Sequence, residues 1–128
     1  MTVSEKIQAV LEAAAAVTVL VPAARVRRPG LTEDVARPYI MHFPVTARPS
    51  HVYGNEGLRA TRIWDVYQVS IFGDSLNSCE AISAAVRDAL DGNHSGVDVR
   101  WSGGGYLGRE DLTGVEHFVM EFRVIENL

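Results

Sequence analysis

Residues 63–72 constrain the fold of this 128-residue chain more than any other stretch. Apolar side chains fall on both faces of the extended strand that this stretch predicts, with Trp64, Val66 and Phe72 on one face and Ile63, Tyr67, Val69 and Ile71 on the other. A strand that is apolar on both faces is typical of the interior of a sheet. We therefore expect a central strand, covered by a helix on one face and by a helix, a loop or a partner on the other.

A first helix is predicted near the N-terminus. Thr2 and Glu5 have the spacing of a capping box, in which a hydroxyl and a carboxylate satisfy free backbone donors. Apolar residues then recur at helical spacing, namely Ile7, Val10, Leu11, Ala14 and Val17. Pro22 ends any continuation.

A second helix is predicted directly after the central strand. Asp74 or Ser75 is the expected N-cap, and Gly92 stands where a left-handed C-cap is expected. The buried stripe is formed by Cys79, Ile82, Val86 and Ala89 or Leu90.

Three further strands complete the expected fold. Residues 39–43 form a strand that opens after Pro38, and residues 97–101 and 117–124 alternate between apolar and polar side chains. Residues 25–37 are read as a connector with a turn at Pro29-Gly30. The prediction is one α/β (α+β) domain over residues 1–128, with an approximately four-stranded mixed or antiparallel sheet and two helices packed on it.

The chain between the first two strands, approximately residues 44–62, is polar and is read as a long loop or an extended hairpin arm. Its basic residues are Arg48, His51, Arg59 and Arg62, and its only acid is Glu56. These four side chains are either simply solvated or contact a partner subunit or the phosphates of passing DNA. Deleting residues 48–57 is expected to leave the monomer folded and to abolish assembly.

The glycines of residues 103–108 match the spacing G-x-G-x-x-G of dinucleotide-binding proteins. That site needs a helix at the third glycine and a further strand with an acidic residue, and the chain ends too soon for either. Residues 102–114 are therefore predicted to be a flexible glycine-rich loop.

No catalytic, metal or cofactor site is predicted. Residues 91–96 imitate the first half of a calcium loop, but Ser102 stands where the bidentate Glu is required. The four histidines lack the paired spacing of a zinc site, and Cys79 lies on the apolar stripe of a helix.

Composition narrows the class of protein. The chain is 47% hydrophobic and 22% charged, which is ordinary for a soluble globular protein. A net charge of −4 argues against a general nucleic-acid binder. No apolar run reaches the ~20 residues that a membrane span needs, so no membrane partner is expected.

Four segments, in this order, resemble the tail-completion and head-tail-joining proteins of long-tailed bacteriophages. They are Arg37-Pro38-Tyr39-Ile40 at the opening of a strand, residues 67–73 in the central strand, residues 80–92 in the helix, and Phe122-Arg123-Val124 in the closing strand.

The resemblance implies a structural virion protein without catalytic residues, found in the tail or neck and assembled in the cytoplasm of the bacterial host. Its members form rings, generally hexameric, that terminate the tail tube at its head-proximal end. The implied partners are further copies of the chain, the tail tube protein and the head-completion or connector proteins, and DNA passes through the lumen without specific binding. The alternatives are a small non-enzymatic protein-binding module of bacterial origin and an enzyme with an unrecognised pocket.

Overall fold

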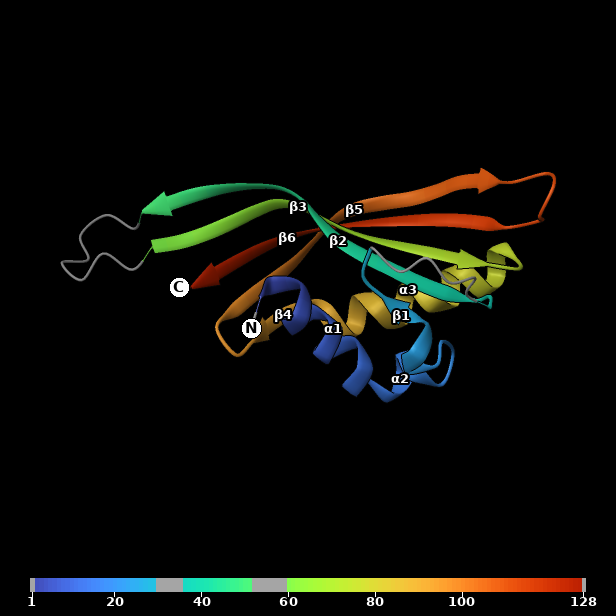
Figure 1. Cartoon of the computed structure of the whole chain (residues 1–128), viewed down its shortest axis with the longest axis horizontal. Helices are drawn as coiled ribbons and strands as arrows, with labels where there is room; N and C mark the ends of the chain where they lie inside the picture. Colours follow the sequence, from blue (N-terminus) through green and yellow to red (C-terminus); the bar gives the residue numbers. More distant parts are fainter. Residues whose placement is uncertain (1, 30–35, 52–59, 128) are drawn as a thin grey trace.

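A computed structural model describes residues 2–29, 36–51 and 60–127 of the chain. Within these residues it contains three α-helices, a short 3-10 helix and six strands (Figure 1). The helices are α1 (Val3–Ala13), α2 (Ala15–Thr18), η1 (Ala23–Arg25) and α3 (Leu76–Leu90). The strands are β1 (Val26–Arg27), β2 (Tyr39–His51), β3 (Ala60–Gly73), β4 (Gly92–His94), β5 (Val97–Arg109) and β6 (Glu116–Asn127).

The described strands form one mixed sheet in the order β1-β2-β3-β6-β5-β4. Strands β2, β3, β6 and β5 pair antiparallel, β4 extends the β5 edge, and β1 runs parallel to β2 at the opposite edge. The mixed sheet with packed helices agrees with the prediction, but the sequence indicated only four strands and two helices. Strands of two or three residues, such as β1 and β4, are too short to show a periodic pattern.

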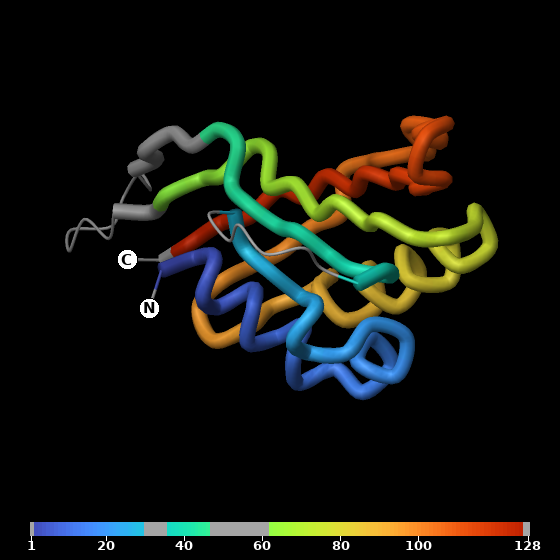
Figure 2. The backbone as a smooth tube through the Cα atoms, turned by 45° about the vertical axis from the view of Figure 1, so that its right-hand side comes forward, coloured from blue at the N-terminus to red at the C-terminus, as the bar shows by residue number. Residues whose placement is uncertain are grey.

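Helices α1, α2 and α3 lie together on one face of the sheet (Figures 1 and 2). Their apolar stripes and the facing strand residues form the core, whose fully buried members include Ile7, Leu11, Tyr67, Val69, Ile71, Ile82, Val86, Leu90, Phe122 and Val124. The central position of β3 is confirmed. No helix of the described chain covers the other face of the sheet, which is called the open face below.

The predicted helix starts are confirmed. The Glu5 backbone N–H donates to Thr2 Oγ1 over 3.2 Å, and the Ser78 N–H donates to Ser75 Oγ over 3.1 Å. The first helix is shorter than its apolar stripe indicates, because the backbone is extended at Ala14 and turns again as α2. Val17 is nevertheless fully buried, so the stripe correctly indicates the side that faces the core.

The predicted glycine-rich loop is wrong, because its first part belongs to a strand. Strand β5 runs on to Arg109 and pairs with β6 as far as the Arg109–Glu116 register, with irregularities between Trp101 and Gly103 and between Tyr106 and Gly108. A Cβ atom at Gly104 would lie 2.3 Å from the Val119 carbonyl oxygen, so glycine allows the close approach of the two strands. Helix α3 ends at Leu90 with Asp91 as its C-cap, and Gly92, which follows with a φ of +134°, opens β4.

The described residues of the segment 44–62 belong to two paired strands. Strand β2 continues to His51 and β3 begins at Ala60, and the two strands pair along their length with irregularities between Pro44 and Ala47. Residues 52–59 lie outside the described chain. The two strands project beyond the helices at the left of Figure 1, and they are called the arm.

Candidate assembly surfaces

The described arm carries three of the four basic residues that the sequence singled out, namely Arg48, His51 and Arg62. The register places Arg48 opposite Ile63 and Arg62 opposite Pro49, so the two arginines stand at neighbouring positions of the paired strands. Arg62 is exposed, and its guanidinium lies 5.7 Å from the centre of the Trp64 ring. The hairpin brings Arg48 and His51 onto one strand of the arm, while Arg59 lies outside the described residues.

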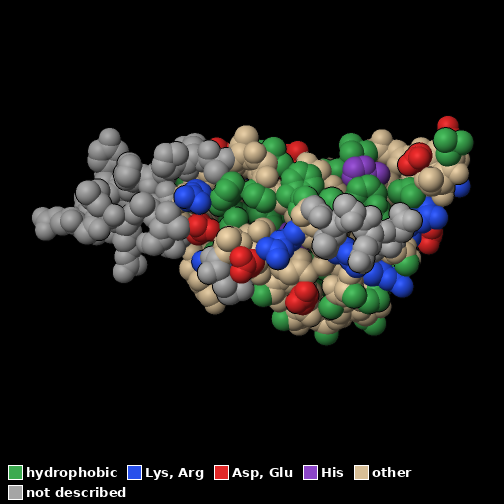
Figure 3. All heavy atoms as spheres, in the orientation of Figure 1, with side chains coloured by type: hydrophobic (Ala, Val, Ile, Leu, Met, Phe, Trp, Pro, Cys, Tyr) green, Lys and Arg blue, Asp and Glu red, His purple; other side chains and the backbone are tan. Residues whose placement is uncertain are grey.

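A second hairpin projects from the opposite end of the sheet. It consists of the outer halves of β5 and β6 and the turn between them, residues 103–121, and is called the wing (Figure 1). Leu107 is 65% exposed and Leu112, in the turn, is 96% exposed. Figure 3 shows hydrophobic, acidic and basic side chains together at this right-hand end of the molecule.

Aromatic rings line up on the open face where β2, β3 and β6 meet. The Tyr39 and Phe72 rings stack with centroids 4.6 Å apart, and the Phe72 and His117 rings stack at 4.3 Å. Burial lowers the pKa of His117 below its usual value. His117 Nε2 is buried and makes no hydrogen bond within the described chain. The row is therefore a strip of stacked aromatic rings.

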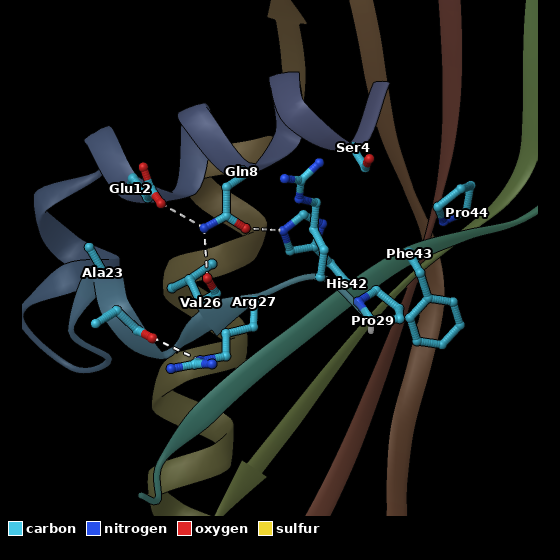
Figure 4. A pocket seen from close by; sticks show the side chains of 12 residues that line it. Ser4, Gln8, Glu12, Ala23, Val26, Arg27, Pro29, His42, Phe43 and Pro44 are labelled. Atoms are coloured by element: carbon cyan, nitrogen blue, oxygen red, sulfur yellow. Dashed lines mark hydrogen bonds between the residues drawn. The ribbon is translucent and has the colours of Figure 1, made fainter. Parts of the chain in front are cut away.

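A pocket of about 690 Å³ opens between α1, η1, β1 and β2 (Figure 4). Half of its lining residues are apolar, namely Ala23, Ala24, Val26, Pro29, Phe43 and Pro44, and the other half are polar or charged. Arg27 and Arg28 contribute positive charge, and Glu12 is the acid among the lining residues.

A chain of hydrogen bonds leads from the core to this pocket. His42 Nε2 lies 2.6 Å from Gln8 Oε1, which can only accept, so Nε2 carries the proton. His42 Nδ1 therefore accepts from the Tyr67 hydroxyl, 2.7 Å away. The Gln8 amide nitrogen donates to Glu12 Oε1 over 2.7 Å and to the Val26 carbonyl over 2.6 Å (Figure 4).

Burial and the nearby Arg28 charge lower the pKa of His42 from 6.5 to about 4, so the ring is neutral at pH 7. Burial also raises the pKa of Tyr67 above its usual value. Both ring nitrogens of His42 are engaged within the protein, so this arrangement holds α1 on the sheet and does not present a general base to the pocket.

The described residues contain no group of three or more His, Cys, Asp or Glu side chains placed to hold a metal ion. Within the same residues, no helix is long and apolar enough to cross a membrane.

A comparison with protein families shows which family the chain belongs to. The family described as "Tail completion protein gp17" matches residues 5–127. The chain belongs to this family. It is therefore a structural bacteriophage tail protein, as the resemblance implied.

A solved structure shows the same fold. One chain of the "Virion of native gene transfer agent (GTA) particle" superposes with a TM-score of 0.71 and 20% sequence identity, covering 98% of this chain and 95% of that chain. A comparison with curated proteins gives no significant match.

The sequence of this member of the tail completion family did not indicate the wing or the pocket. The wing was hidden because its glycines indicate a loop, and only the pairing with β6 makes them a strand. The one local signal was Leu112, an apolar residue in an acidic turn. The pocket is built from helix, short strand and long strand residues far apart in the sequence, and no local pattern indicates it.

Proposed function

We propose that the chain forms a ring at the head-proximal end of the phage tail, where it terminates the tail tube and joins the tail to the head connector. The family membership supports a role in completing the tail. The likeness of the fold to a chain in a virion particle supports a place in the assembled particle. The same membership favours assembly over the small protein-binding module.

The placement of the two hairpins carries the proposal. The arm and the wing leave opposite ends of one sheet, and the helices back the same sheet between them (Figure 1). The two ends differ in chemistry, since the arm is basic and the wing turn is apolar and acidic. Contacts between unlike surfaces of identical subunits are heterologous, and they close into a ring when the rotation per subunit allows it.

The remaining features fit a ring through which DNA passes. A hexameric ring would leave the basic residues Arg48, His51, Arg59 and Arg62 either against the next subunit or near the DNA. A net charge of −4 suits a lumen that conducts DNA without holding it. The partners are further copies of the chain, the tail tube protein and the head-completion proteins, and assembly takes place in the host cytoplasm.

Loss of the gene in an infecting phage tests the proposal. We expect filled heads and separate tails of irregular length in lysates examined by electron microscopy, because tube growth is not stopped and the joint is missing. Supplying the wild-type chain from a plasmid should restore joined particles. Normal virions in the absence of the chain would contradict the proposal.

A further inference from the structure

We propose that the tip of the wing of one copy inserts into the pocket between α1, η1, β1 and β2 of the next copy. This inference rests on the proposed ring and names one contact that would build it. The occupant of the pocket is therefore a second copy of this chain, held by an apolar side chain and by opposite charges.

The wing tip has the form of an inserting residue. Leu112 is 96% exposed at the end of a hairpin, where an isolated large apolar side chain has no packing role in its own subunit. Glu110 and Asp111 precede it and are also exposed. The tip is thus an apolar side chain preceded by two acidic residues, a combination that favours a partner surface with apolar and basic side chains.

Hydrogen bonds within its own subunit hold the tip in place. Few residues would therefore have to become ordered when the tip inserts into a partner. The Glu110 N–H donates to the Val115 carbonyl over 2.9 Å, and the Gly114 N–H donates to the Glu110 carbonyl over 2.8 Å. Arg37 Nη1 donates to the Thr113 carbonyl over 3.0 Å, and Arg37 also pairs with Asp74 at 3.2 Å. Preorganisation of this kind reduces the entropic cost of association.

The pocket has the complementary form. Its volume of about 690 Å³ lies within the roughly 300–1,000 Å³ typical of binding pockets, so it accommodates a leucine and its neighbours. Ala23, Ala24 and Pro29 offer short apolar side chains to the Leu112 side chain. Arg28 is exposed at the pocket, and its charge acts on both His42 and Tyr67.

The tip and the pocket are different surfaces of the same chain. An apolar residue that enters a pocket elsewhere on an identical molecule makes a heterologous contact, which repeats from copy to copy. The contact therefore generates a ring or a filament, and it does not produce a closed two-fold dimer. This agrees with the geometry that the proposed function requires.

Disulfide trapping tests the contact directly. The pair Leu112→Cys and Ala24→Cys should give a ladder of cross-linked oligomers after mild oxidation, because each bond joins the tip of one copy to the pocket of the next. Cys79, the single native cysteine, is fully buried and should not interfere. The matched control pairs Leu112→Cys with Ala81→Cys, an exposed position of α3 outside the pocket, and should give no ladder. Equal ladders from the two pairs would overturn the proposal.

Substitutions give a second measurement. Leu112→Asp should abolish rings in negative-stain images, with or without tail tubes, and leave the melting temperature unchanged. Val19→Asp, at an apolar position that is 79% exposed and away from the wing, is the control and should keep the rings. Arg28→Glu should also abolish rings, and combining it with Glu110→Arg and Asp111→Arg should restore them.

The failures of the two proposals are distinguishable. Rings that persist in Leu112→Asp would overturn the contact and leave the ring itself standing. If Leu112→Asp forms rings that no longer bind tail tubes, the wing tip binds the tube protein. That result would also overturn the contact between the wing tip and the pocket. A wild-type chain that forms no ring, alone or with tubes, would overturn the proposed function.

Discussion

His42 is an ionisable side chain that is fully buried between α1 and the sheet, with both ring nitrogens hydrogen-bonded. Its pKa of about 4 in the folded state lies below the usual 6.5, so the unfolded chain binds more protons between these values. Stability must then fall as pH decreases from about 6.5 to about 4, by up to about 3 kcal/mol from this residue.

Unfolding by urea at pH 7.0, 6.0 and 5.0 measures this dependence. The wild-type free energy of unfolding should decrease over the series more steeply than that of His42→Gln, which lacks the titrating ring. Carboxylates titrate in both proteins, so the difference between the two curves isolates His42. Parallel curves would show that His42 is not held neutral by the fold.

Tyr67 contributes the hydroxyl that His42 accepts. Tyr67→Phe should destabilise the fold by about 1–3 kcal/mol, because it leaves a buried nitrogen without a donor. Ser83→Ala is the control: its hydroxyl donates to the Glu80 carbonyl over 2.8 Å on the exposed side of α3, where water can replace the lost donor. Equal losses of unfolding free energy in the two variants would contradict this assignment.

At the scale of elements, the wing depends on the close approach of β5 to β6. Gly104→Ala should destabilise the fold by roughly 1–3 kcal/mol, because the new methyl group would meet the Val119 carbonyl oxygen and the backbone has a φ of +152° there. Gly105→Ala is the matched control, since a Cβ at Gly105 meets nothing within 4 Å. Melting temperatures of the two variants compare these costs, and equal shifts would argue against the close approach.

The arm should contribute to assembly and not to the stability of the monomer. Replacing residues 52–59 by Asn-Gly retains the paired strands and supplies a favoured two-residue turn. The melting temperature should stay within about 2 °C of wild type, while ring formation should be lost because the replaced residues are expected to contact the next subunit. Intact rings from this variant would remove residues 52–59 from the assembly contacts.

The sequence predicted those elements that local patterns specify. The caps at Thr2 and Ser75, the stripe of α3 and the two-faced strand β3 follow from spacing within one segment. The continuation of β5 beyond residue 101 did not follow, because its glycines have low strand propensity and only the contact with β6 selects the extended form. The wing tip and the pocket were not predicted for a related reason. Each exists as a surface only once distant segments have packed together.

At the scale of the whole molecule, the account requires one sheet with a basic arm at one end and an apolar, acidic wing tip at the other. Light scattering over a concentration series, with negative-stain images of the same sample, tests this most directly. We expect closed rings with a central hole, and a mass several times the 14.0 kDa of one chain, either alone or when tail tubes are added. A strict monomer at every concentration that also leaves added tail tubes uncapped would contradict the central claim.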